Sequence, residues 1–268
     1  MTIQDGPTDW ESPSGSRWFE RLSPSRAPRF RFFCFPYAGG SADVYRNWQQ
    51  WFPEQLDICL VHLPGRGKNM GKRAFSSLVP LVAEIADHIT LLTDIPYALY
   101  GHSMGALISF ELARELSRRQ EKGPERLFVS GCRAPQCPID EPFLFKLPGN
   151  AFLDALKKLN GTPKEVFENP ELMELVIDLL RADFEVVETY QYRPEQPLSC
   201  PIIVYGGTED GHVPAEACHQ WQKQTTASCT VRMFPGDHFF VRNAGLEFGN
   251  AFRRDVLSAV SSTPMGTI

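Results

Sequence analysis

The 268-residue sequence lacks any apolar run long enough to cross a membrane, and its longest hydrophobic stretches are the size of single strands. Its first residues show neither a basic cluster nor an apolar core, so they do not have the pattern of a secretory signal. Positive charge is also in short supply, with 27 Lys and Arg against 32 Asp and Glu and a net charge of -5. We therefore expect neither nucleic acid nor a membrane as a partner.

Cysteine pairs and metal-binding patterns are absent as well. The seven cysteines stand singly, no C-x-x-C pair occurs, and the six histidines lack the spacing of zinc ligands. Several cysteines fall within apolar segments, where a reduced thiol packs as a small hydrophobic group. We expect a cytoplasmic protein with reduced thiols and no structural metal.

What the sequence does contain is an alternation of strand-sized apolar segments and helix-sized amphipathic segments. The expected strands are 31–35, 58–63, 97–100, 127–130, 202–205 and 230–234. The expected helices of this alternation are 41–48, 78–93, 106–113, 215–223 and 246–260. Such an order predicts an α/β fold with a mostly parallel central sheet flanked by helices on both faces.

Composition also divides the chain. Residues 1–28 are rich in proline, serine and charge, and we expect them to form a loosely ordered N-terminal arm. A single domain is expected at 29–262, because a chain of this length buries one large core, and residues 263–268 are expected to form a C-terminal tail.

The interval from about 133 to 197 interrupts the alternation. It shows no strand pattern and two amphipathic helices, at 151–159 and from 170 to about 192. Insertions at this point of an α/β sheet commonly cover the carboxyl ends of the strands, so the interval is a candidate lid; the alternative is an ornament packed elsewhere. Asp183 falls on the apolar stripe of the second helix, where an unpaired carboxylate is costly. We expect it to fix the lid to the body by an ion pair or a hydrogen bond.

The most informative motif is Gly101-His102-Ser103-Met104-Gly105, between the expected strand 97–100 and the expected helix 106–113. The pattern G-x-S-x-G is a weak signal by itself, but a strand before it and a helix after it are the context of a nucleophile elbow. At such a turn the serine points outward at the top of the sheet, and the flanking glycines leave room for the backbone. The residue after the serine can donate its backbone N–H to a developing oxyanion.

A serine nucleophile needs a base, because an aliphatic hydroxyl is weak at neutral pH. On this kind of fold the order along the chain is serine, then an acid, then histidine, with the last two in loops that follow strands. Asp210 follows the strand 202–205, and His238 follows the strand 230–234. We therefore predict Ser103 as nucleophile, His238 as base and Asp210 as orienting acid.

Other acids and histidines compete less well. Glu209 and Asp237 adjoin the favoured acid and base, and each stays an alternative that would point inward only if its neighbour pointed away. The remaining histidines are expected in structural or surface positions: His62, His88, His102, His212 and His219. His102 in particular cannot reach around to serve the adjacent serine, and we expect it to pack or hydrogen-bond locally.

An oxyanion hole needs a second backbone N–H besides that of Met104. Residues 35–41, Phe-Pro-Tyr-Ala-Gly-Gly-Ser, follow the strand 31–35 and are rich in small side chains that let backbone approach a ligand. Ala38 is the predicted donor, and Tyr37 beside it is the alternative. The structural interpretation of the same segment is a plain glycine turn.

Taken together, these motifs resemble the type II thioesterases that serve nonribosomal peptide and polyketide synthases, which are α/β-hydrolases related to the medium-chain thioesterases of fatty acid synthesis. The resemblance covers about residues 28–260 and rests on segments in the family's order: 35–41, Leu63-Pro64-Gly65-Arg66, 100–106, 180–184, Tyr190-Gln191-Tyr192, Cys200-Pro201-Ile202, 206–210 and 236–240. One departure is visible at Gly67-Lys68-Asn69, where the family usually has an acidic residue and a second arginine.

The resemblance implies the same Ser103, His238 and Asp210 triad, and an oxyanion hole from the N–H groups of Ala38 and Met104. It implies a substrate in which an acyl group is held as a thioester on the phosphopantetheine arm of a carrier protein. The implied role is editing in trans, the removal of aberrant or stalled acyl groups in nonribosomal peptide or polyketide synthesis, with no metal or dissociable cofactor. The alternatives are chain termination in fatty acid synthesis, a small-molecule carboxylesterase, and an idle hydrolase fold used for binding.

The partner expected from the resemblance is the carrier protein, and we expect the chain itself to be a monomer. Carrier proteins are acidic, as is this chain, so docking requires local patches or apolar contact. Four cations on loops are candidates for such a rim: Arg66, Lys68, Arg133 and Lys146. A charged side chain on a loop is more often simply solvated.

Overall fold

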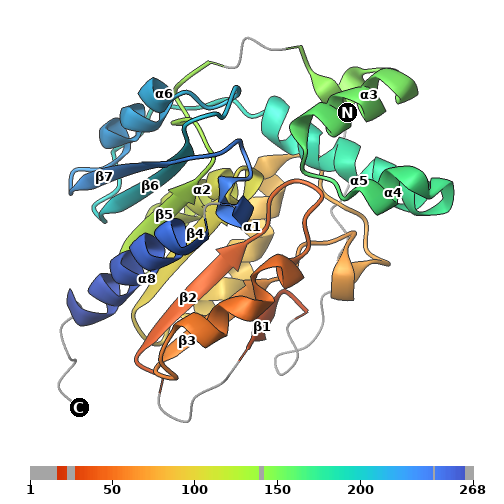
Figure 1. Ribbon diagram of the computed structural model, residues 1–268. Coiled ribbons are helices and arrows are strands. Elements are labelled where there is room, and N and C mark those ends of the chain that lie inside the picture. Colours follow the sequence, from red (N-terminus) through yellow and green to blue (C-terminus); the bar gives the residue numbers. More distant parts are fainter. Residues whose placement is uncertain (1–16, 23–27, 139–141, 244, 263–268) are drawn as a thin grey trace.

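The computed structural model describes residues 17–22, 28–138, 142–243 and 245–262. Its centre is a seven-stranded sheet in the order β1-β3-β2-β4-β5-β6-β7 (Figure 1). The strands are β1 (Phe19–Arg21), β2 (Phe30–Phe35), β3 (Leu56–Val61), β4 (Tyr97–His102), β5 (Arg126–Ser130), β6 (Ile202–Gly207) and β7 (Cys229–Phe234). All neighbours pair in parallel except β1, which is antiparallel to β3. This is the predicted α/β-hydrolase sheet.

The expected N-terminal arm needs a correction. Within 1–28, residues 19–21 form the edge strand β1, and Trp18 beside it is 1% exposed. The strand was not predicted because Trp18 and Phe19 are two apolar residues within a segment that is otherwise rich in polar and charged residues. The rest of the arm, 1–16 and 23–27, lies outside the described residues, as does the expected tail 263–268.

Helices cover both faces of the sheet. The α-helices are α1 (Leu78–Ile89), α2 (Met104–Arg118), α3 (Gly149–Leu159), α4 (Lys164–Glu168), α5 (Pro170–Glu188), α6 (Ala215–His219), α7 (Phe240–Asn243) and α8 (Gly245–Ser262). Shorter 3-10 segments are η1 (Ala42–Trp51), η2 (Gly67–Asn69), η3 (Thr90–Leu92), η4 (Leu144–Lys146) and η5 (Gln220–Gln224). The helix expected at 41–48 is thus a 3-10 helix, although Ser41 caps it by accepting from the Asp43 N–H.

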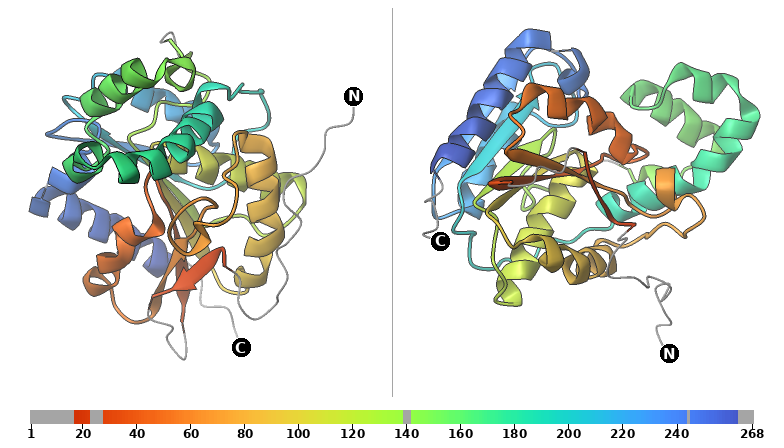
Figure 2. Two further views of the ribbon diagram at one scale, coloured as in Figure 1. Left: turned by 90° about the vertical axis from the view of Figure 1, so that its right-hand side faces the viewer. Right: turned by 90° about the horizontal axis from the view of Figure 1, so that it is seen from below.

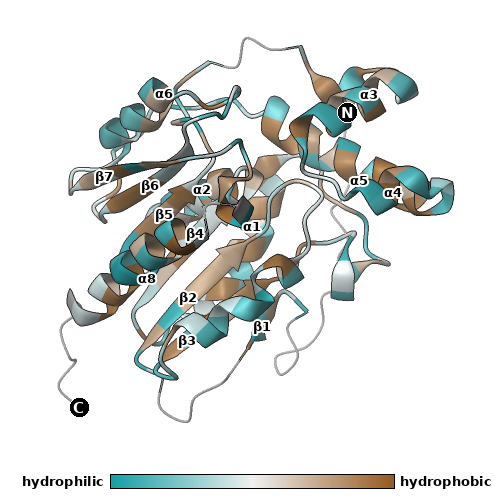
Figure 3. Ribbon diagram, viewed as in Figure 1, coloured by the Kyte–Doolittle hydropathy of each residue, from teal (hydrophilic) through white to brown (hydrophobic). Residues whose placement is uncertain are grey.

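The core has two parts because successive side chains of each buried strand point to opposite faces. Phe33 and Phe35 face the layer of α1 and α2, whereas Phe32 and Cys34 face the layer of η1 and α8. Figure 3 shows the apolar strands at the centre and mixed polar and apolar colouring on covering helices such as α8. With both faces covered, the loops at the strand ends are the place where a site can form.

The helical insertion within 133–197 consists of η4, α3, α4 and α5, and it projects to one side of the sheet (Figure 2). It has a small apolar core of its own around Phe152, Leu156 and Leu180. The helix expected from 170 to about 192 ends at Glu188, and residues 190–197 form neither helix nor strand. The insertion thus lies beside the carboxyl ends of the strands.

Candidate active site

Ser103 lies at a strained turn between β4 and α2. Its backbone has φ 53° and ψ -117°, values that a residue with a side chain rarely adopts. Two glycines make this turn possible: a Cβ on Gly101 would lie 2.0 Å from the backbone of Gly105, and a Cβ on Gly105 would lie 2.2 Å from the Phe35 carbonyl oxygen. The Ser103 N–H donates to the Ser130 carbonyl at 2.8 Å. The turn is therefore held from neighbouring strands on both sides.

Asp210 and His238 meet at the ends of β6 and β7. His238 Nδ1 lies 2.7 Å from Asp210 Oδ2, and Asp210 Oδ1 accepts from the backbone N–H groups of His212 and Val213 at 2.9 and 3.1 Å. Burial by itself would raise the pKa of Asp210, but the bond with His238 and the two backbone bonds outweigh it and lower the pKa. The carboxylate therefore stays charged and fixes the imidazole with Nε2 free to act as a base.

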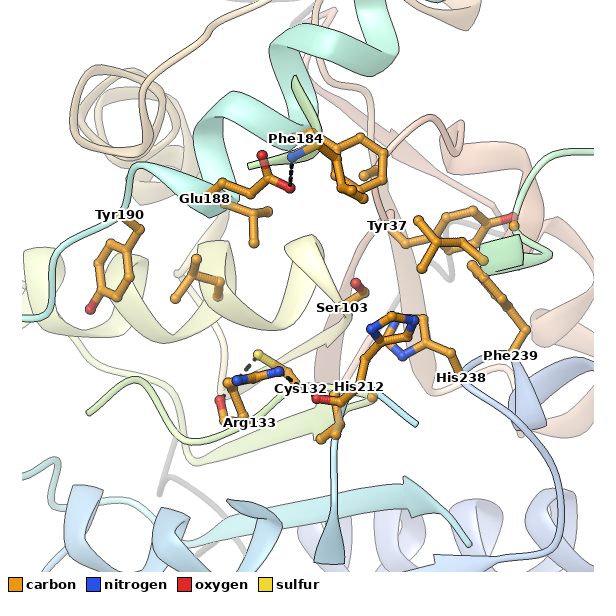
Figure 4. Close-up of a pocket in the computed structure, with 18 of the residues that line it drawn as sticks. Tyr37, Ser103, Cys132, Arg133, Phe184, Glu188, Tyr190, His212, His238 and Phe239 are labelled. Carbon is orange, nitrogen blue, oxygen red and sulfur yellow. Dashed lines mark hydrogen bonds between the residues drawn. The ribbon is translucent and has the colours of Figure 1, made fainter. Parts of the chain in front are cut away.

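Ser103 and His238 line the same cavity, whose volume is about 190 Å³. Figure 4 shows the Ser103 side chain beside the His238 ring at the centre of this cavity. The remaining wall is largely apolar and comes from helix α2 and the insertion: Leu107, Leu144, Leu156, Leu180, Phe184 and Val187. A nucleophile, a base and an apolar cleft together can accommodate and attack an acyl group.

The alternative acids point elsewhere. Asp237 accepts from the Phe239 N–H at 2.8 Å and from Asn160 of the insertion at 3.2 Å, while Glu209 is exposed. His212, expected on the surface, is exposed and also lines the cavity. Its side chain was missed because only the tertiary turn after Asp210 brings it toward the opening.

The other histidines have structural partners or an exposed position. His62 Nε2 lies 2.8 Å from Glu20, His88 Nε2 lies 3.3 Å from Glu84, and His219 is exposed. His102 is fully buried, its Nδ1 lies 2.9 Å from Ser130 Oγ, and its ring centre is 5.2 Å from that of His238. Burial, with smaller contributions from His238 and Arg242, lowers the pKa of His102 well below its ordinary value.

The segment after β2 borders the same cavity as Ser103 and His238. Both Ala38 and Tyr37 line the cavity, but the Tyr37 ring packs edge-on against His102 and Phe239, and its hydroxyl is bonded to Arg242. The N–H of Met104 belongs to the first turn of α2, where helix N–H groups have no acceptor within the helix. The backbone at Ala38 and Met104 can therefore offer two donors beside Ser103.

Asp183 forms an ion pair with Arg66. This confirms the expectation that a carboxylate on the apolar stripe of the helix needs a partner. The two form a bidentate pair with N–O distances of 2.6 and 2.7 Å. Arg66 is thus buried at 5% exposure, which removes it from the expected solvent-facing rim. This correction has a simple cause: the guanidinium is drawn to the only carboxylate that the insertion presents to its loop in the described chain.

The remaining rim cations differ from one another. Arg133 lines the cavity and donates to the backbone carbonyls of Pro138 and His212, whereas Lys68 pairs with Glu20 at 2.7 Å. Lys146 is exposed above the Phe143 ring, with its Nζ 4.8 Å from the ring centre. Cys132 and Cys137 also line the cavity and were not predicted as site residues, since isolated cysteines carry no local signal.

Across 17–22, 28–138, 142–243 and 245–262, no group of three or more His, Cys, Asp or Glu side chains is arranged to hold a metal ion. None of the helices in those same ranges combines the length and the apolar character needed to cross a bilayer.

Comparison with known proteins now gives the family. The Thioesterase domain model matches residues 30–249. The chain belongs to this thioesterase family. It is 40% identical over 232 residues to the gramicidin S biosynthesis protein GrsT of Aneurinibacillus migulanus, covering 87% of this chain and 91% of that protein.

Two solved structures of thioesterases have the same fold as this chain. The thioesterase resembles RedJ, a thioesterase of the prodiginine pathway of Streptomyces coelicolor, with a TM-score of 0.80 and 33% identity over 87% of this chain and 91% of that one. It also resembles BorB, a type II thioesterase of a borrelidin biosynthetic cluster, with a TM-score of 0.81 and 29% identity over 91% and 97% of the two chains. The protein is a thioester hydrolase on an α/β-hydrolase fold.

Proposed function

We propose that this thioesterase hydrolyses acyl thioesters on the phosphopantetheine arm of carrier proteins and acts in trans to remove aberrant or stalled acyl groups. The observation that carries the proposal is that Ser103, at its strained elbow, and the His238–Asp210 pair share a largely apolar cavity whose wall is partly formed by the helical insertion. Two relatives support the choice of carrier-bound substrates: GrsT is named as a gramicidin S biosynthesis protein, and BorB as a type II thioesterase of a borrelidin biosynthetic cluster.

In the proposed reaction, Ser103 Oγ attacks the thioester carbonyl carbon while His238 Nε2 takes the hydroxyl proton. Asp210 stabilises the imidazolium that forms. The N–H groups of Ala38 and Met104 stabilise the negative charge on the carbonyl oxygen. Collapse of this intermediate breaks the C–S bond, and His238 returns its proton to the leaving thiol.

The acyl-serine is then hydrolysed by the reverse use of the same groups. His238 removes a proton from water as the water oxygen attacks the acyl carbon, and it gives that proton to Ser103 Oγ as the C–O bond breaks. The acid leaves and the enzyme is restored. We propose that the reaction needs no metal or dissociable cofactor and that the enzyme works as a cytoplasmic monomer whose partners are carrier domains.

A time course of acyl release tests the proposal. Carrier proteins loaded with acetyl through medium-chain acyl groups are compared with matched small thioesters and oxygen esters. We expect carrier thioesters to be hydrolysed fastest, and Ser103→Ala to lose about a thousandfold or more in rate while still binding the carrier. Faster cleavage of oxygen esters would indicate a carboxylesterase, and marked preference for one medium chain length would indicate chain termination. Undiminished activity of Ser103→Ala would refute the triad.

A further inference from the structure

A buried ion pair lies outside the triad and joins three segments that are distant in sequence. Asp183 on α5 is 2% exposed, and its two oxygens accept from the Arg66 guanidinium. Asp183 Oδ2 accepts a further bond, from the backbone N–H of Gly39 at 2.7 Å. Arg66 in turn donates to the carbonyls of Gly40 and Pro64 at 3.4 and 3.2 Å. The pair thus binds the segment that contains Ala38 from both its N–H and its C=O groups.

Close packing shows that α5 lies directly on this segment. Gly39 has φ +73°, and a Cβ placed on it would lie 2.4 Å from Leu180 Cδ2. A Cβ on Gly65, in the loop that carries Arg66, would lie 3.1 Å from Leu179 Cδ1. The backbone after β2 and the backbone after β3 are therefore both covered by one turn of the insertion helix.

The opposite end of the segment is also held. The Gly40 N–H donates to the Tyr37 carbonyl at 2.9 Å, and Arg242 of α7 binds the Tyr37 hydroxyl. Ala38 consequently has a fixed residue on each side, Tyr37 and Gly39. The Ala38 N–H lies in the planar peptide that contains the Tyr37 carbonyl, and this carbonyl accepts from the Gly40 N–H. Because Asp183 binds the Gly39 N–H and Arg66 binds the Gly40 carbonyl, the pair holds the residues that fix this plane and thus the direction of the Ala38 N–H.

A buried ion pair seldom adds stability over apolar side chains of the same size, since both charges must be desolvated. Its effect here is geometric. We infer that Asp183, together with Arg66, is a positioning residue that aligns the Ala38 N–H with the oxyanion, so that the insertion helix is part of the oxyanion hole. This inference rests on the proposed reaction at Ser103.

The size of the effect follows from the chemistry. Loss of a complete oxyanion donor costs about a hundredfold to a thousandfold in kcat, and a displacement of about 1 Å can cost a hundredfold. Asp183→Asn keeps the shape of the side chain but loses the charge and sets an N–H against Arg66. We expect kcat for a small thioester to fall about tenfold to a hundredfold, with KM within about threefold of the parent value.

The matched control is Asp178→Asn, an exposed residue of the same helix. The second readout is the affinity for an acyl-chain boronic acid, which bonds to Ser103 Oγ and places an oxygen in the oxyanion hole. We expect its affinity to fall by the same factor as kcat in Asp183→Asn and to be unchanged in Asp178→Asn. A merely structural role would lower the melting temperature but leave kcat per titrated active site and boronate affinity unchanged.

Arg66→Lys decides the question if Asp183→Asn does not fold. Lysine keeps the positive charge but lacks the planar fork, so kcat and boronate affinity should again fall together, by about tenfold. Parent-like values in both folded variants, or in Arg66→Lys if it alone folds, would overturn the inference and leave the proposed function intact. If the parent protein hydrolysed no thioester, the proposed function would fail first, whereas boronate binding would still report on the Ala38 N–H.

Discussion

At the scale of single residues, the site depends on where a Cβ atom is missing. Gly101 and Gly105 flank Ser103, and each backbone lies so close to another that a methyl group has no room. The strain at Ser103 is possible because β4, α2 and the end of β2 together fix the turn. A substitution at either glycine therefore acts on the nucleophile without touching it.

We predict that Gly105→Ala lowers kcat by about a hundredfold or more and lowers the free energy of unfolding by about 1–3 kcal/mol. The added methyl would lie 2.2 Å from the Phe35 carbonyl oxygen and must push the start of α2 away from β2. Thioester turnover and urea unfolding measure the two effects.

The control is Gly123→Ala. A Cβ there meets no heavy atom within 4 Å in the described part of the chain beyond its own neighbours. This variant should have parental turnover and stability. If Gly105→Ala behaved like Gly123→Ala, the close approach of α2 to β2 would not be what holds the elbow.

At the scale of elements, the insertion determines the shape of the cavity. Glu188 at the end of α5 accepts from the backbone N–H groups of Leu144 and Phe145 at 2.9 and 3.1 Å. These bonds hold the η4 turn against α5, and Leu144 of that turn lines the cavity. The position of the cavity wall at Leu144 therefore depends on the Glu188 carboxylate.

We predict that Glu188→Ala releases η4 and broadens the acyl preference. Leu144 then no longer has a fixed position, so longer chains should gain in kcat/KM relative to acetyl by about threefold to tenfold. A kcat/KM profile over chain length measures this shift, and Glu174→Ala, an exposed position on the same helix, serves as the control. A profile with the parental shape would show that Glu188 does not determine the wall.

At the scale of the whole molecule, buried histidines couple stability to pH. The pKa of His102 lies well below its ordinary value of about 6.5, chiefly through burial, and the pKa of His62 is lowered for the same main reason. Below about pH 6.5 the unfolded chain thus binds more protons than the folded one. The contribution of these two histidines to the free energy of unfolding is fully present above this pH and is lost as the pH falls below it.

We expect the free energy of unfolding to fall between about pH 6.5 and pH 5.5, with His102 contributing up to about 1.4 kcal/mol per pH unit. His102→Gln keeps a hydrogen-bonding group near Ser130 and removes the titration. Its unfolding free energy should therefore depend less steeply on pH in urea titrations, whatever its absolute stability. Equal slopes for the two proteins would contradict a neutral buried imidazole at position 102.

Much of the fold was predictable because its signals are local. All six expected parallel strands occur, with ends shifted by two residues at most, since each is a short apolar run with a turn after it. β1 was missed because it is three residues long and lies in a polar segment. Helix α5 was predicted too long, because the apolar spacing continues to Tyr190 although the helix has already ended at Glu188.

The sequence by itself determined which residues we propose for the chemistry. Ser103 follows from the elbow motif, and Asp210 and His238 follow from their places after strands, because parallel strands bring their carboxyl ends to one edge. Only the tertiary structure decided how the oxyanion segment is held: Asp183 and Arg66 are 117 residues apart and belong to different layers. Local spacing predicts that a buried carboxylate needs a partner, but the partner is chosen by the packing of α5 on two loops, which no single segment encodes.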